Sequence, residues 1–222
     1  MLKGSALSLK SAPRSFQANK EADVSRTIAS DHGDKRASIL RNAAILFAEE
    51  GYGRASMADV AKACGISKAN IYHYYGGKDA LLFDILENHL LFLRDRIKGL
   101  EYPSTDPKEK LTFIMTEILL AYQGADAEHD VLLNATRALP EAQQEILRQY
   151  QREFLGYGRT ILSELVPEAI AKDKAKMRAL TMSAFGMLNW HYKWNSDASE
   201  ETRRKNAKLI AELVIGGVQN IS

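Results

Sequence analysis

The chain has 222 residues, of which 45% are apolar and 26% are charged, so its composition excludes a protein that is disordered throughout. This length exceeds one typical domain and favours a small module joined to a larger one. The formal net charge is +2, with twelve Lys or Arg against eight Asp or Glu in the first 80 residues. That weak basic bias suits a phosphate-bearing partner at the N-terminal end. No apolar run reaches the roughly 18 residues that span a bilayer, and the single Cys64 excludes an internal disulfide, so we expect a cytoplasmic protein with no membrane partner.

Residues 1–33 are polar, rich in Ser, Ala and Lys, and lack a sustained helical period. Such a segment buries too little apolar surface to offset the entropy of ordering, so we expect a disordered polar arm. The alternative is a basic arm that contacts a DNA backbone, for which only Lys20 and Arg26 lie near enough to the first helix.

From Asp34 onward the pattern is helical. Apolar residues recur along one face from Ile39 to Phe47, and Gly51 stands at a natural C-cap position. Residues that favour strands rarely occur together. After this first helix, the pattern predicts helices over 57–64, 68–74, 78–98, 107–124, 128–137, 140–165, 171–194 and 199–220. The helix over 78–98 must join the two modules directly, because no Gly/Ser linker separates them.

The segment from Ser56 to Tyr75 has the pattern of a helix-turn-helix. Ser56 and Asp59 have the spacing of a capping box, which predicts a helix start. Gly65 supplies the residue that tolerates positive φ where the chain turns. Ile66 is expected to fill the angle between the two helices, and Ser67 to cap the second one.

The second helix of this unit presents polar and aromatic side chains outward. Its first turn carries the residues that a recognition helix offers to base edges, while Tyr hydroxyls and Lys suit phosphate. We expect Lys68, Asn70 and His73 to contact bases, and Ser56, Tyr72, Tyr74 and Lys78 to hold phosphate. The full set of expected DNA-binding residues is Ser56, Ser67, Lys68, Ala69, Asn70, Tyr72, His73, Tyr74 and Lys78. The alternative is that the tyrosines only pack a small three-helix module.

Residues 35–81 resemble the DNA-binding domain of the tetracycline-repressor (TetR) family of bacterial regulators. The match runs Ser56-Met-x-Asp-Val-Ala-x-x-x-Gly-Ile-Ser-Lys-x-x-Ile-Tyr-x-Tyr-Tyr-x-x-Lys78-Asp-x-Leu-Leu82. Ser56 stands where Thr is usual, Ala69 where Gly is common, and Tyr75 where Phe is usual. The resemblance implies an all-α protein with a three-helix DNA-binding domain over 34–80 and a six-helix ligand-binding and dimerisation domain over 81–222.

The resemblance also implies a homodimer, in which the helices over 171–194 and 199–220 of each subunit form a four-helix interface. Suitable apolar residues are Leu180, Phe185, Leu188, Trp190, Tyr192, Trp194, Leu209, Ile210, Leu213, Val214 and Val218, with Gly216 and Gly217 permitting close approach. The alternative is that these two helices pair within one chain.

In relatives the effector pocket lies among the helices expected here over 107–165, with help from the helix over 171–194. The candidates for an apolar cavity with a few polar groups are Phe113, Glu117, Tyr122, Asn134, Arg137, Tyr150, Phe154, Tyr157 and Trp190. The stretch from Phe185 to Trp194 resembles a TetR subgroup whose members respond to acyl coenzyme A thioesters. We therefore expect a small apolar or acyl-CoA effector and no cofactor.

The sequence thus predicts a ligand-responsive transcriptional repressor that binds a palindromic operator. The first rival is an enzyme, but no catalytic or nucleotide-binding motif occurs and the five His residues are scattered. Glu128, His129 and Asp130 are residue types that can bind a metal ion. Adjacent positions on a helix diverge by about 100°, so these three side chains are not expected to converge on one ion. The second rival is a helical interaction protein that no longer binds DNA.

Overall fold

The protein is described here by a computed structural model, which covers residues 15–195 and 198–221. These residues form helices and connecting turns without strands, so the expected all-α class is confirmed. The elements are α1 (Ser15–Glu50), α2 (Met57–Ala63), α3 (Lys68–Tyr74), α4 (Lys78–Lys98), α5 (Pro107–Ala121), α6 (Asp126–Ala135), η1 (Thr136–Ala138), α7 (Glu141–Ser163), α8 (Glu168–Lys172), α9 (Lys174–Asn189), α10 (His191–Asn195) and α11 (Glu200–Val218).

The first helix differs from expectation at its N-terminal end. It begins at Ser15, whereas the sequence indicated a disordered arm over residues 1–33. Residues 15–33 contain no Pro, and the three Ala residues, Gln17, Lys20 and Glu21 among them have high helix propensity. The part of the expected arm over residues 1–14 lies outside the described residues. The chain divides into two compact units within α1, between Ile39 and Leu40, and the expected domain boundary near residue 80 stays a prediction.

Two small glycine-dependent turns shape the N-terminal part of the second unit. α1 ends at Gly51, whose φ of 84° lies in the left-handed region that Gly adopts without strain. Gly65, with φ of 63°, makes the turn between α2 and α3. α2 packs against α3, and the apolar residues Val60, Ala61 and Ile71 are buried.

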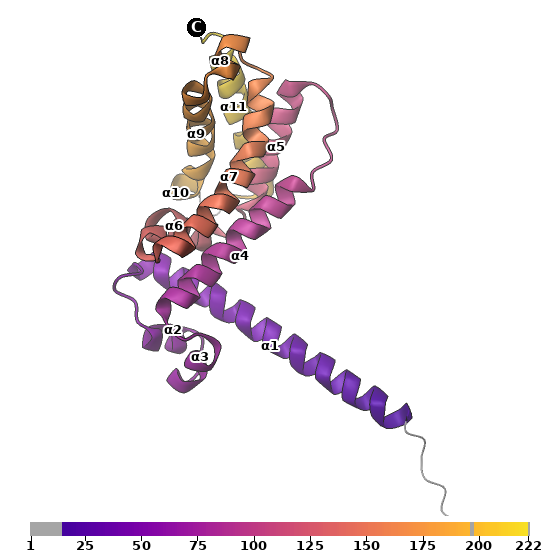
Figure 1. Ribbon diagram of the computed structural model, residues 1–222, viewed down its shortest axis with the longest axis vertical. Helices are drawn as coiled ribbons and strands as arrows, with labels where there is room; N and C mark the ends of the chain where they lie inside the picture. The colour runs from indigo at the N-terminus through magenta and orange to yellow at the C-terminus, as the bar shows by residue number, and fades with distance from the viewer. Residues whose placement is uncertain (1–14, 196–197, 222) are drawn as a thin grey trace, which may run out of the picture. The chain divides into compact units, whose positions relative to one another are not determined.

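The larger part of the second unit is a helical bundle (Figure 1). α4 packs against α7, and α5 packs against α11, α7 and α9. The core is apolar and includes Leu93, Ile97, Ile114, Met115, Ile118, Phe154, Ile161, Phe185, Leu188, Ile210 and Val214. Gly158 of α7 is needed for this packing, because a Cβ there would lie 2.8 Å from the Phe185 ring of α9.

The expected helix over 171–194 is divided into three. Asp173 begins α9 by accepting hydrogen bonds from the backbone N–H groups of Ala175 and Lys176, which separates it from α8. α9 ends at Asn189, and the short α10 follows. The expected helices over 171–194 and 199–220 therefore correspond mainly to α9 with α10 and to α11.

Among the described residues, no helix combines the length and the apolar composition that crossing a bilayer requires.

Candidate nucleic-acid interface and sensor region

The start of α2 is fixed by the capping box that the sequence predicts. The Ser56 hydroxyl accepts a 3.2 Å hydrogen bond from the Asp59 backbone N–H, and the Asp59 carboxylate accepts from the Ser56 backbone N–H at 2.9 Å. The Ser56 hydroxyl also donates to Asp59 at 2.6 Å. These hydrogen bonds hold the pKa of the Asp59 carboxyl below its usual value, because they favour the charged form. The hydroxyl expected to hold phosphate is thus engaged within the chain, and its phosphate contact stays a prediction.

The start of α3 is fixed in a similar way. The Ser67 hydroxyl accepts a 3.1 Å hydrogen bond from the Asn70 backbone N–H. Ile71 and Tyr75 are buried on the inner side, as their four-residue spacing predicts. The orientation of α3 is therefore set by a cap at one end and two buried side chains.

The opposite side of α3 is exposed to solvent. It carries Lys68, Ala69, Asn70, Tyr72 and His73, all of which are exposed, with 46% of Tyr72 accessible. Tyr74 is half-buried beside His73, with ring centroids 6.0 Å apart. The structure therefore brings the expected base-reading residues together on one short, capped helix.

The Lys78 ammonium was expected to contact DNA phosphate, but in the structure it is bound to backbone carbonyls of the same chain. Its Nζ donates to the carbonyl oxygens of Tyr52 at 2.7 Å and Ala55 at 2.9 Å, and lies 4.3 Å from the centre of the Tyr52 ring. Two of its three N–H donors are thus used to hold the turn between α1 and α2 against the start of α4.

Two further side-chain contacts join the helix-turn-helix to α4. The Tyr75 hydroxyl donates to Asp84 Oδ2 at 2.5 Å, and the Tyr52 hydroxyl donates to Asp79 Oδ1. Partial burial and the neighbouring carboxylate raise the pKa of Tyr52, so its hydroxyl stays protonated as a donor. α4 therefore holds α3 through Tyr75 and the α1–α2 turn through Tyr52 and Lys78.

The expected pocket residues fall into two groups. Tyr122 and Phe154 are buried, and Phe113, Glu117, Tyr150 and Tyr157 are half-buried, whereas Asn134, Arg137 and Trp190 are exposed. Several inner members already have partners: Glu117 forms a 2.9 Å ion pair with Arg96, Tyr122 donates to Asn189 at 2.9 Å, and Tyr150 donates to Glu87 at 3.3 Å. The structure does not bring all nine around one space.

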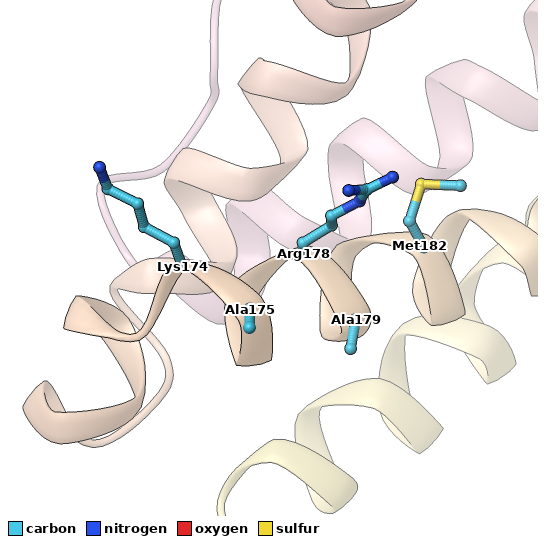
Figure 2. A pocket seen from close by; sticks show the side chains of 5 residues that line it. All are labelled: Lys174, Ala175, Arg178, Ala179 and Met182. Atoms are coloured by element: carbon cyan, nitrogen blue, oxygen red, sulfur yellow. The ribbon is translucent and has the colours of Figure 1, made fainter.

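Of the eleven large apolar side chains that are exposed in the described residues, six lie on α9, α10 or α11 or, for Trp190, between α9 and α10. Met182, Met187, Trp190, Trp194, Leu209 and Leu213 are each at least 38% exposed, and we call them the α9–α11 face. A shallow groove continues from Met182 along the first turns of α9, and Figure 2 shows its lining side chains, Lys174, Ala175, Arg178, Ala179 and Met182. Other residues expected at an interface are buried within the chain instead, namely Phe185, Leu188, Tyr192, Ile210, Val214 and Val218. The structure therefore assigns the buried residues to packing within the chain, and an intersubunit role for the exposed ones stays a prediction.

Comparison with known protein families assigns both parts of the chain. Residues 39–85 match the model of bacterial regulatory proteins of the tetR family, and residues 104–218 match that of the tetracyclin repressor-like C-terminal domain. The second match alone covers more than half of the chain. The chain belongs to the TetR family.

Individual TetR-family proteins agree with this assignment. A TetR-family transcriptional regulator from Bordetella parapertussis superposes with a TM-score of 0.76 and 34% identity, over 84% of this chain and 97% of that one. An uncharacterized HTH-type regulator from Bacillus subtilis, YvdT, is 32% identical over 44% of this chain and 56% of its own length. The regulator AibR, solved with isovaleryl coenzyme A and operator DNA, shares the fold at 22% identity, with a TM-score of 0.65, over 83% of this chain and 97% of that one. The chain spans about half the length of the first curated relatives that it matches.

Four buried polar side chains in this TetR-family chain were not predicted from the sequence. His89 on α4, His129 on α6 and His191 on α10 are buried, as is Arg203 on α11, which donates to the Leu119 carbonyl at 3.3 Å. Each of these residues lies on the buried face of its helix. The only sign of this burial in the sequence is a polar residue that interrupts a row of apolar ones. A single sequence does not distinguish such a position from an exposed one.

Proposed function

We propose that this TetR-family chain is a DNA-binding transcriptional regulator, acting as a repressor that a small effector releases from a palindromic operator. The observation that carries the DNA-binding part is the exposed side of α3. Lys68, Asn70, Tyr72 and His73 share it, and the Ser67 cap and buried Ile71 fix its direction. This set combines donors for base edges with hydroxyl and cationic groups for phosphate.

A palindromic operator has two symmetric half-sites, and each half-site binds one copy of α3. We therefore infer that the protein binds DNA as a homodimer. The α9–α11 face supports this inference, because exposed apolar patches on otherwise polar surfaces mark protein interaction sites. Leu209 and Leu213 on α11 lie one turn apart, and Gly216 and Gly217 extend the same helix with open space around them. The two tryptophans at the end of α9 and in α10 enlarge the apolar area.

The effector is proposed to bind among α4, α5, α6 and α7, and to be a small apolar molecule or an acyl-CoA. AibR, which has this fold, was solved with both isovaleryl coenzyme A and operator DNA. An effector changes operator affinity only if it binds the two conformers of the regulator unequally. Since α4 carries the side chains that hold α3 and the α1–α2 turn, a shift of α4 would change the spacing of the two recognition helices.

A helical interaction protein without DNA-binding activity is the second candidate. The α9–α11 face would fit such a protein equally well, so the distinction rests on α3. Selection of bound sequences from a random DNA pool separates the two. The proposal predicts enrichment of a palindrome with half-sites about one helical turn apart. Recovery of no common sequence would favour the interaction protein.

A thermal-shift screen tests the effector part separately. Coenzyme A thioesters of increasing acyl length are expected to raise the melting temperature, because a ligand that binds only the folded state stabilises it. Stabilisation by unrelated amphipathic drugs alone would contradict the acyl-CoA proposal and leave DNA binding untouched.

A further inference from the structure

Two buried histidines face each other where α4 meets α6. His89 of α4 is 5% exposed and His129 of α6 is 2% exposed. Their ring centroids lie 5.8 Å apart, with the planes at 68°.

The pair has hydrogen-bonding capacity that the described side chains and backbone do not use. His89 Nε2, His129 Nδ1 and His129 Nε2 are buried and have no hydrogen-bond partner among the described residues. The backbone of Asn189 raises the pKa of His129, but neither ring nitrogen reaches hydrogen-bond geometry. Buried polar groups are nearly always paired, so three such atoms at one place point to a group that the site receives.

The surrounding aromatic groups are already satisfied. The Tyr122 ring lies 4.3 Å from the His129 ring and the Tyr192 ring 5.3 Å from it. The Tyr122 hydroxyl donates to Asn189 at 2.9 Å, and the Tyr192 hydroxyl donates to Asp130 at 2.8 Å. Among these four rings, the two imidazoles therefore have hydrogen-bonding capacity to spare.

The chemistry of the pair selects a neutral ligand group. Burial lowers the pKa of His89 to about 3 and that of His129 to about 4, so both rings are uncharged near neutral pH. The nearby carboxylate of Asp130 is engaged by Lys193 and Tyr192. A neutral imidazole has one N–H donor and one acceptor, so His129 leaves a donor unused in either tautomer. A carbonyl oxygen accepts such donors without bringing a charge into the core.

We propose that His89 and His129 recognise the carbonyl oxygen of the effector's acyl group. This inference rests on the proposed effector-responsive function and deepens it. Because one imidazole belongs to α4 and the other to α6, a carbonyl oxygen that accepts a hydrogen bond from these rings changes the contact between the two helices. α4 also carries Lys78, Asp79 and Asp84, so the same helix links the site to the helix-turn-helix.

Histidine-ring nitrogen NMR tests the site directly. The full-length protein is labelled with ¹⁵N only in its five histidines, and the signals are assigned with single His→Phe variants. Four probes of one chain length are added in turn: hexanoyl-CoA, hexanamide, sodium hexanoate and 1-hexanol, with coenzyme A alone as control. The proposal predicts that hexanoyl-CoA or hexanamide moves the His89 and His129 ring signals, while those of His73 stay unchanged. If no probe moves them, or only hexanoate or hexanol does, the carbonyl site is wrong.

Variants with matched shapes supply the second readout. His129→Phe keeps an aromatic ring without hydrogen bonds, and His129→Gln keeps a donor and an acceptor. The affinity for the carbonyl probe that moves the ring signals is expected to fall at least tenfold in His129→Phe and His89→Phe, and to stay within threefold in His129→Gln. The control is His191→Gln, which changes a buried histidine outside the pair, and its affinity is expected to stay within threefold. A folded His129→Phe variant that binds the probe like the wild type would overturn the site.

The failure of this inference is distinguishable from failure of the proposed function. If hexanoyl-CoA releases operator DNA equally from the wild type and from His129→Phe, the regulator stands and the carbonyl site is wrong. If the ring signals respond to hexanoyl-CoA but operator binding does not change, the site stands and effector-driven release is wrong.

Discussion

The Tyr75 hydroxyl donates a 2.5 Å hydrogen bond to Oδ2 of Asp84, and so joins the end of the recognition helix α3 to α4. Tyr75 is 7% exposed, and its hydroxyl is the only part that a Phe at the same position would lack. The contact therefore adds a polar restraint to a position that is otherwise filled by an aromatic ring. It bears on both the stability of the helix-turn-helix and its coupling to the proposed effector-binding part of the chain.

Replacing Tyr75 by Phe removes this restraint without changing the packed ring. We expect the free energy of unfolding to fall by about 1 kcal/mol, the typical net value of one such hydrogen bond. Urea denaturation followed by circular dichroism measures the change. The matched control is Tyr72→Phe, which alters an exposed hydroxyl of the same helix and is expected to leave stability unchanged. Equal stability of Tyr75→Phe and the wild type would show that the hydrogen bond does not restrain α3.

Replacing Lys78 by Met removes the ammonium that serves the Tyr52 and Ala55 carbonyls. We expect a loss of about 1 to 2 kcal/mol in the free energy of unfolding, since hydrogen bonds to charged groups are stronger than neutral ones. Lys68→Met provides the contrast, because Lys68 is exposed on α3 and its loss should leave the melting temperature unchanged. If both variants melted like the wild type, Lys78 would be a phosphate contact alone and not a structural clamp.

The capping box at the start of α2 makes the stability of the protein depend on pH. The pKa of Asp59 is lowered in the folded protein, so its stabilising effect is present above the unfolded pKa of 3.8 and is lost as the pH falls through the lower folded value. Asp59→Asn should therefore be less stable than the wild type at pH 7, and the difference should shrink below pH 4. Chemical denaturation of both proteins at pH 7 and pH 3 checks this. A difference that stays constant with pH would assign the effect to packing.

Replacing Leu213 by Lys places a charge on the α9–α11 face. If this face joins two subunits, the burial of an unpaired ammonium should disrupt the dimer. Light scattering after size-exclusion chromatography is expected to give the mass of one chain for the variant and of two for the wild type. Leu133→Lys is the control, because Leu133 is a similarly exposed apolar residue on α6. A dimer that survives Leu213→Lys would place the interface elsewhere.

Local signals in the sequence predicted most of the fold. Ser56 with Asp59, Gly65 and Ser67 determine short-range hydrogen bonds and backbone angles, so they could be recognised from spacing alone. Apolar periodicity likewise predicted the helices over 78–98 and 107–124, although the second one ends at Ala121. The break at Asp173 was missed because a cap inside a continuous helical pattern resembles an ordinary polar position. The N-terminal part of α1 was missed because its helix propensity comes without an apolar stripe.

Long-range contacts explain what the sequence did not predict. Lys78 satisfies carbonyls more than twenty residues away, at Tyr52 and Ala55, so its partners could not be inferred from local spacing. His89 and His129 are forty residues apart and meet only because α4 packs against α6. The same holds for the expected interface residues, since their periodicity does not tell which apolar side chain faces the core and which faces outward.

The most direct test of the central claim is the affinity of the protein for its selected operator, measured by fluorescence anisotropy as a function of salt. We compare the wild type with a Lys68→Ala, Tyr72→Ala double variant, which leaves the Lys78 clamp intact. The wild type should bind the palindrome far more tightly than a scrambled duplex, and the variant should lose this preference while remaining a folded dimer. Loss of the Lys68 cation from the DNA interface should also make log affinity depend less steeply on log salt. An unchanged preference for the palindrome in the folded variant would contradict the assignment of α3 as the DNA-reading helix.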